Sequence, residues 1–344
     1  MRNNNFDFLR FILAFNVVIS HLIGVTKIDI FQPFQPFFNA YTSVTCFFVI
    51  SGFLIVASYI RSNSLKDYLK KRASRLLPAY LFVIICSALF LVFVSQLSFH
   101  DYFVNTEFAR YLFANLSFLN FLQPSLPGVF TLNNTFSAVN GALWTLKIEV
   151  GFYLIIPLIV LLISKINKKY IVFILIYILS ICYKIIFEYL SHEYSLNLSV
   201  FANQLPGFMS YFVSGIACYY YFNFFKAHNV KLLFIAILIL LIERVLDVEI
   251  ATPVSLSIIV FFIAFNFSRL NNFAKFGDIS YGIYIYHLPL LQLAIHFELF
   301  KKYNPILVSI LFIVTVLSVG MLSWHLLEKR YLKRGKNQQI LKKI

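Results

Sequence analysis

Charged residues are scarce in this chain. Only 12% of its 344 residues are Asp, Glu, Lys or Arg, whereas soluble domains carry about 25%. So few charges do not cover a water-facing surface, and 60% of the residues are hydrophobic. The polar residues gather in short clusters between apolar runs of about 20 residues, the length that crosses a bilayer core. This pattern excludes an ordinary soluble domain and predicts an integral membrane protein.

Cysteine is also rare, and the four cysteines fall in four different apolar runs. They show neither metal-ligand spacing nor a disulfide framework, so we treat them as small apolar side chains and expect no metal site. The net charge of +15 is typical of the basic cytoplasmic loops of a membrane protein. No basic stripe has the context of a nucleic-acid-binding fold, so we expect no nucleic-acid partner.

The apolar runs predict an all-α bundle of about ten transmembrane helices. Lys and Arg collect in alternate connections, including the segment from Lys66 to Arg75 and the C-terminal tail. By the positive-inside rule, both termini are then cytoplasmic. The first run lacks a small-residue cleavage site, so it is a permanent helix and not a signal peptide. The expected helices are 6–26, 40–61, 76–98, 142–163, 170–190, 205–224, 232–247, 253–268, 279–298 and 304–326.

Four prolines refine these helices. Pro78 and Pro206 are expected at helix starts, where a missing N–H is harmless. Pro157 and Pro289 fall inside expected helices. There each would kink the helix and free a carbonyl for a polar neighbour.

The connection 99–141 is long and rich in aromatic residues and asparagine. Long connections in compact folds are usually functional, so we expect a lid or a platform for an acceptor. An amphipathic piece at 107–122 is expected to lie on the outer membrane face. The alternative is a solvated spacer, which the aromatic content disfavours.

Two ionisable residues are expected inside the membrane, where a charge costs about 2.5–3.5 kcal/mol even on insertion scales. His21 lies roughly 7 Å, and Glu149 roughly 5 Å, outward of the midpoint of its own helix. At similar depth, a carboxylate would fix the tautomer of an imidazole that acts as a general base. Two alternatives stay open: His21 bonds a backbone carbonyl, or Glu149 makes a structural bond to a tyrosine or tryptophan.

Arginines mark the cytoplasmic side. Arg10 either snorkels to lipid headgroups or points inward to an anion, with Asp7 three residues earlier to hold it. Arg72 and Arg75 lie in a basic loop that opens the third helix, on one helical face. Paired guanidinium groups suit phosphate oxygens. The alternative is the ordinary basic surplus of a cytoplasmic loop.

Six segments carry a family resemblance when taken in order. They are Arg10 to His21 with ten residues between them, Phe47 to Ile55 (FFVISGFLI), Arg72-x-x-Arg75 with Pro78, Trp144 to Tyr153, Gly277 to Pro289, and Trp324 to Glu328. Together they resemble the motifs of the membrane-bound acyltransferase-three family, whose members include O-acetyltransferases of surface polysaccharides. The resemblance covers residues 6 to about 330.

The resemblance implies an acyltransferase of the bacterial inner membrane that takes acetyl-CoA, or a related acyl-CoA, from the cytoplasm. It implies a glycan or lipid-linked glycan acceptor, such as O-antigen, capsule or exopolysaccharide. By position it makes His21 the catalytic residue, with Glu149 as its partner. It assigns the donor to three arginines and supporting roles to further residues: Arg10, Arg72 and Arg75 for the donor; Asp7, Ser51, Trp144, Tyr153 and His287 in support.

We expect residues 1–330 to form the membrane domain, 331–344 to form a basic cytoplasmic tail, and no extracytoplasmic hydrolase-like domain. Three other functions stay open. The first is acylation of a different acceptor: a periplasmic glucan, a small glycoside or peptidoglycan. The second is a transporter or flippase in which His21 and Glu149 relay protons, and the third is a receptor or scaffold. The sugar, the hydroxyl position, the acyl chain, the oligomeric state and the choice between direct transfer and an acyl-histidine relay are not determined by the sequence.

Overall fold

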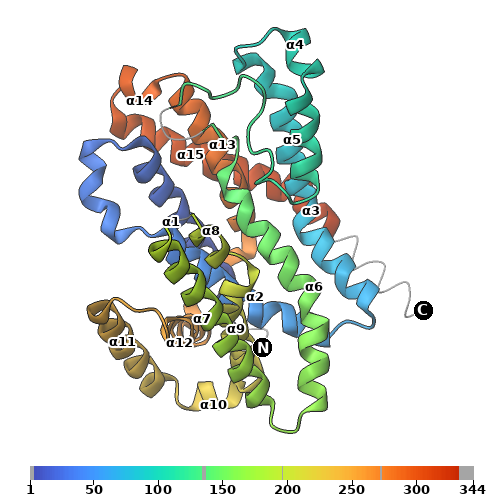
Figure 1. Ribbon diagram of the computed structural model, residues 1–344, viewed down its shortest axis with the longest axis vertical. Coiled ribbons are helices and arrows are strands. Elements are labelled where there is room, and N and C mark those ends of the chain that lie inside the picture. The colour runs from blue at the N-terminus through green and yellow to red at the C-terminus, as the bar shows by residue number, and fades with distance from the viewer. Residues whose placement is uncertain (1–3, 134–136, 196, 272, 333–344) are drawn as a thin grey trace. The chain divides into compact units, whose positions relative to one another are not determined.

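The computed structural model describes residues 4–133, 137–195, 197–271 and 273–332, and this part of the chain is helical without a strand (Figure 1). Arg2 and the expected basic tail from residue 333 onward lie outside the described residues. The longer helices are α1 (Phe6–Thr26), α2 (Ala40–Ile60), α3 (Leu65–Phe90), α5 (Thr106–Leu116), α6 (Trp144–Lys165), α7 (Lys169–Glu193), α9 (Leu205–Tyr220), α11 (Asn229–Leu246), α12 (Thr252–Asn266), α13 (Ser280–His296) and α15 (Pro305–Ser323).

Shorter elements connect these helices. They are α4 (Phe99–Val104), α8 (Ser199–Ala202), α10 (Phe222–Ala227), α14 (Leu299–Lys302), the 3-10 helices η1 (Asp29–Phe37), η2 (Leu91–Val94), η3 (Gly141–Leu143), η4 (Ser268–Leu270) and η5 (Phe273–Phe276), and the π-helix η6 (Trp324–Glu328). The chain divides into two compact units. Unit 1 comprises Met1–Leu13, Tyr41–Leu69 and Ile148–Phe273, and unit 2 comprises Ala14–Ala40, Lys70–Lys147 and Ala274–Ile344.

Each of the ten expected helices has a counterpart among the described helices. Within the described part of the chain, six helical stretches are long and apolar enough to cross a membrane. They are Phe6–Thr26, Asp29–Ile60, Leu65–Val94, Gly141–Lys165, Lys169–Glu193 and Pro305–Leu332. The all-helical class and the apolar character are therefore confirmed, while the count of ten spans and the cytoplasmic termini stay predictions.

The third helix corrects two expectations. It begins at Leu65, so Arg72 and Arg75 lie inside α3 and not in a loop. The Ser64 hydroxyl accepts the Asp67 backbone N–H at 3.1 Å and caps this start, as a polar N-cap residue does. Pro78 accordingly lies inside the helix and not at its start. Apolar runs mark only the membrane-embedded part of a helix, so they missed three charged turns.

The other prolines follow the expectation. Pro206 occupies the first turn of α9. Pro157 cannot bond the carbonyl four residues earlier, and that carbonyl, on Tyr153, accepts the Tyr68 hydroxyl at 3.0 Å. Pro289 likewise frees the Ile285 carbonyl, which accepts the Asn140 side-chain N–H at 2.8 Å. Each freed carbonyl is thereby joined to a second segment of its own unit.

The aromatic connection 99–141 is packed against α3 in unit 2. The Tyr102 hydroxyl donates to the Ala88 carbonyl at 2.9 Å, and the Tyr80 hydroxyl donates to the Asn115 carbonyl at 2.6 Å. Figure 1 shows α4 and α5 beside the C-terminal end of α3. Part of the expected amphipathic piece is α5, which begins at Thr106. These bonds are not those of a solvated spacer; a lid or platform function stays a prediction.

The helix surfaces agree with a lipid environment. On α7 the exposed large side chains include Ile171, Ile174, Leu175 and Ile178. Contiguous exposed apolar faces of this kind are unusual on soluble monomers. On a helix of 25 residues, they are what hydrocarbon chains contact.

In unit 1, α2 and α9 meet at two glycines. A Cβ on Gly52 would stand 2.0 Å from the Phe212 carbonyl oxygen, and a Cβ on Gly215 would stand 2.0 Å from the Val49 carbonyl oxygen. Small residues let membrane helices approach until their backbones touch. The glycine after Ser51 is therefore a packing requirement of this crossing.

Candidate active site

Two imidazoles face each other in unit 2. His21 lies on α1, and His287 lies on α13, with 0% of its surface exposed. The Nδ1 atom of His21 is 2.8 Å from the Nε2 atom of His287, and the two rings are nearly parallel, with centroids 5.1 Å apart and planes 9° apart. The other ring nitrogen of His287, Nδ1, is 2.7 Å from the Tyr284 carbonyl oxygen. His21 is thus the free end of a short hydrogen-bonded chain.

The segment of α13 that carries His287 is tied to the first turn of α6 and to the chain just before it. The Tyr284 hydroxyl lies 2.7 Å from the Thr145 hydroxyl, and Asn140 bonds the Ile285 carbonyl. Five residues after His287, the Gln292 side chain donates to the Ala138 carbonyl at 2.9 Å. These bonds fix the position of this part of α13 and, with it, the position of the His287 ring. Trp144, at the start of α6, is half-buried beside these contacts.

Arg75 pairs with an acidic residue that lies within one of the six motif segments but was given no function from the sequence. Its guanidinium forms an ion pair with Asp278, of which 8% is exposed, just before α13. The same carboxylate accepts the Ser280 hydroxyl. Arg72 lies one turn earlier on α3 and is half-buried. A guanidinium held by a carboxylate has a fixed orientation, which suits recognition of phosphate oxygens.

A second buried carboxyl lies close by. Glu328 is 0% exposed and accepts the Ser323 hydroxyl at 3.1 Å within the π-helix η6. Gly277 has a φ of +140°, and a Cβ there would stand 2.4 Å from the Trp324 ring. The indole therefore lies directly against the backbone beside Asp278. The sequence did not single out Glu328 as a site residue because it lies at the end of an apolar run. For Asp278 the available signal was its position two residues before the serine that begins α13.

In unit 1, Arg10 forms an ion pair with Asp7, and 22% of the arginine side chain is exposed. The expected pairing of these neighbours is confirmed, and their contact with a donor stays a prediction. Ser51 lies on α2 beside the glycine of the helix crossing.

Glu149 makes the tyrosine bond that the sequence left open. The Tyr153 hydroxyl, one turn later on α6, donates to Glu149 Oε1. Tyr153 itself is held by the Tyr68 bond to its freed carbonyl. Glu149 belongs to unit 1 and His21 to unit 2, so their pairing stays a prediction.

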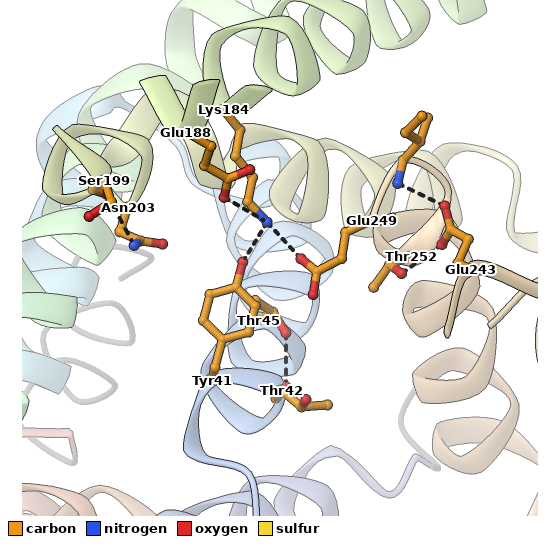
Figure 2. Close-up of polar contacts among 12 residues, drawn as sticks. Tyr41, Thr42, Thr45, Lys184, Glu188, Ser199, Asn203, Glu243, Glu249 and Thr252 are labelled. Carbon is orange, nitrogen blue, oxygen red and sulfur yellow. Dashed lines mark hydrogen bonds and ion pairs between the residues drawn. The ribbon is translucent and has the colours of Figure 1, made fainter. Parts of the chain in front are cut away.

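A further charge cluster in unit 1 was not anticipated. Lys184, inside α7 with 11% of its side chain exposed, places its Nζ atom 2.6 Å from Glu249 and 3.0 Å from the Tyr41 hydroxyl. Glu188 lies 3.7 Å from the same nitrogen. Figure 2 shows the ammonium group between these three side chains. The signal was a lysine within an apolar run. Glu188 is four residues away on the same helix, whereas Tyr41 and Glu249 come from segments far apart in sequence.

Among the described residues, no three His, Cys, Asp or Glu side chains are grouped so as to hold a metal ion. The candidate groups are instead the imidazole pair and the two arginines of α3, Arg72 and Arg75. This set of groups can exchange a proton with a hydroxyl and can orient an anionic ligand.

Comparisons with known proteins agree along the length of the chain. A family profile described as an acyltransferase domain matches residues 3–243. The O-acetyl transferase of Shigella phage Sf6 is 30% identical over 349 positions, covering 97% of this chain and 97% of that protein. Nodulation protein 10 of Rhizobium leguminosarum bv. viciae is 27% identical over 361 positions, covering 96% of this chain and 93% of that protein. No solved structure matches the chain.

Proposed function

Because the chain belongs to the acyltransferase-three family, we propose that it transfers an acetyl group from acetyl-CoA to a hydroxyl of a surface polysaccharide or its lipid-linked precursor. A relative that aligns with 97% of the chain is named an O-acetyl transferase, which supports oxygen as the accepting atom. The observation that carries the proposal is an imidazole pair, His21 and His287, in an acyltransferase. Paired imidazoles provide a base for a hydroxyl group.

His21 is the catalytic residue of the proposal. As a general base, it takes the proton of the acceptor hydroxyl while the hydroxyl oxygen attacks the thioester carbonyl carbon. As a nucleophile, it instead carries the acyl group briefly and then passes it to the hydroxyl. Both routes release the thiol of the donor, and they differ in whether an acylated His21 forms.

Arg72 and Arg75 bind the phosphates of the donor in this proposal. Asp278 supports this assignment because its ion pair fixes the direction of the Arg75 guanidinium. Arg10, on the same helix as His21 with ten residues between them, is proposed as a third cation for the donor. Phosphates carry several oxygens, which paired guanidinium groups bind well.

The protein is placed by this proposal in the bacterial inner membrane, with both termini in the cytoplasm. Donor then arrives from the cytoplasmic side, where the basic start of α3 lies. The acceptor arrives from the outer side, where the packed connection 99–141 is proposed as its platform. The outward position of His21 on its own helix supports this direction of transfer.

The test is mass spectrometry of surface glycans from four strains: gene intact, gene deleted, His21→Ala and His228→Ala. We expect a mass difference of one acetyl group that is lost in the deletion and in His21→Ala. His228 is an exposed histidine at the end of α10 whose ring bonds the Phe224 carbonyl of that helix, so its replacement is a matched control that keeps the acetyl group. Unchanged glycans in all strains would remove the polysaccharide acceptor from the proposal.

A further inference from the structure

The hydrogen bonds through the two histidines have only one possible direction when both rings are neutral. A backbone carbonyl can only accept, so Nδ1 of His287, 2.7 Å from the Tyr284 oxygen, carries the ring proton. A neutral imidazole has one N–H, so Nε2 of His287 is an acceptor. The Nδ1 atom of His21, 2.8 Å away, must therefore donate to it. This leaves Nε2 of His21 with its lone pair.

The opposite direction requires His287 to be a cation with a proton on each nitrogen. Its side chain is 0% exposed, and burying a charge costs far more than burying a neutral, hydrogen-bonded ring. Its two bonds are satisfied without any charge, by a carbonyl on one side and an N–H on the other. The neutral arrangement is therefore the stable one in the free protein.

We propose that His287 is a positioning residue that holds His21 in its Nδ1–H tautomer, so that Nε2 is the nitrogen that reacts. This inference rests on the proposed function, in which His21 is the catalytic base. The orienting function expected of a carboxylate is then performed by a second imidazole. The hydrogen bond between the nearly parallel rings, whose planes are 9° apart, also sets the direction in which Nε2 points.

The reaction balances on this tautomer. Nε2 of His21 takes the hydroxyl proton as the hydroxyl oxygen bonds to the thioester carbonyl carbon. The C–S bond then breaks, sulfur leaves with its electron pair, and it receives that proton from Nε2. Between these events His21 is an imidazolium, and its Nδ1–H bond to His287 becomes charge-assisted. Such bonds are roughly twice as strong as neutral ones, so His287 stabilises the state in which the proton is on His21.

Two substitutions separate positioning from packing. In His287→Gln, the amide keeps one acceptor for His21 and one donor for the Tyr284 carbonyl. In His287→Phe, a flat ring of similar size fills the space and both bonds are lost. Correct proton placement contributes about 10²–10⁴-fold to such reactions. We expect the Phe variant to lose at least ~10²-fold in kcat, with KM for acetyl-CoA unchanged, and the Gln variant to recover most of that loss.

The kinetic measurement uses thiol release from acetyl-CoA by the full chain in membranes isolated from the producing cells, which supply the acceptor. His21→Ala is the reference for loss of the base, and thermal unfolding checks that each variant is folded. If both His287 variants release thiol at the wild-type rate while His21→Ala is inactive, the inference is overturned and the proposed function stays intact. A fully active His21→Ala variant refutes the assigned function of His21 first.

A spectroscopic measurement tests the tautomer in the unaltered protein. The chain has seven histidines, so solid-state NMR of ¹⁵N-histidine-labelled protein gives a small set of ring signals. The signals lost in His21→Ala identify His21, and we expect a protonated Nδ1 and an unprotonated Nε2. A protonated Nε2 on His21 overturns the proposal, whatever the His287 variants do.

Discussion

Gly52→Ala tests the packing of α2 against α9, the crossing that carries the serine–glycine motif. The added Cβ would stand 2.0 Å from the Phe212 carbonyl oxygen. The obstacle is backbone, so no side chain can rotate away. Contact distances below 3.0 Å are essentially never seen for real Cβ atoms. The two helices must therefore separate locally by about 1 Å, the difference between these distances.

The magnitude follows from two opposing effects. Inserting a methyl group into a filled contact typically costs about 1–3 kcal/mol, and a backbone obstacle places this site at the upper end. Replacing glycine by alanine inside a helix returns about 1 kcal/mol. We expect a net loss of about 2 kcal/mol in the free energy of unfolding, which corresponds to a Tm lower by roughly 4 °C.

The assay is thermal or SDS unfolding of the purified protein in detergent, with three companion variants. Gly215→Ala meets the Val49 carbonyl at the same distance and should cost as much. Because both substitutions open one crossing, the double variant should cost less than the sum of the single ones. Gly24→Ala is the control, since a Cβ there meets nothing within 4 Å; it should leave stability unchanged or raise it.

If Gly52→Ala unfolds at the same point as the wild type and as Gly24→Ala, the close crossing of α2 and α9 is wrong. Full additivity of Gly52→Ala and Gly215→Ala would also refute the reasoning, because it would mean that the two glycines do not share one contact.

Two further predictions concern charges. Glu249→Gln should lower the free energy of unfolding by about 1–2 kcal/mol; the value is small because half of the Glu249 side chain is exposed. Adding Lys184→Met should recover most of this loss in the same SDS titration. A further loss of stability in the double variant would show that Lys184 does not need Glu249 as a partner. Asp278→Asn should raise KM for acetyl-CoA about tenfold, near 1.4 kcal/mol, at similar kcat, because Arg75 loses the ion pair that orients it. An unchanged KM would mean that this ion pair is structural only.

Much of the helical framework was predictable from local pattern. Apolar runs of bilayer length located ten helices, and prolines within them correctly indicated carbonyls open to side chains. The pairing of Arg10 with Asp7 followed from a spacing of three residues on a helix. The start of α3 was missed because its charged turns leave the apolar run, although the Ser64 cap marked the true beginning.

The partners of the site residues were not predictable in the same way. His21 and His287 are 266 residues apart in sequence, and nothing local specifies that their rings form a hydrogen bond. Asp278 meets Arg75 across 203 residues. The family resemblance predicted that His287 is a supporting residue. Which of its ring nitrogens faces His21 is visible only in the tertiary structure.

Scarce charge and long apolar runs are properties of the chain read in one direction, and they predicted a membrane-embedded helical protein. The order of the motifs, which is a property of the same kind, predicted the acyltransferase family. The tertiary structure alone decided which ionisable groups meet. Which groups meet depends on how helices distant in sequence pack side by side. A hydrogen bond forms only when donor and acceptor atoms are within about 3 Å of each other, and packing sets that distance.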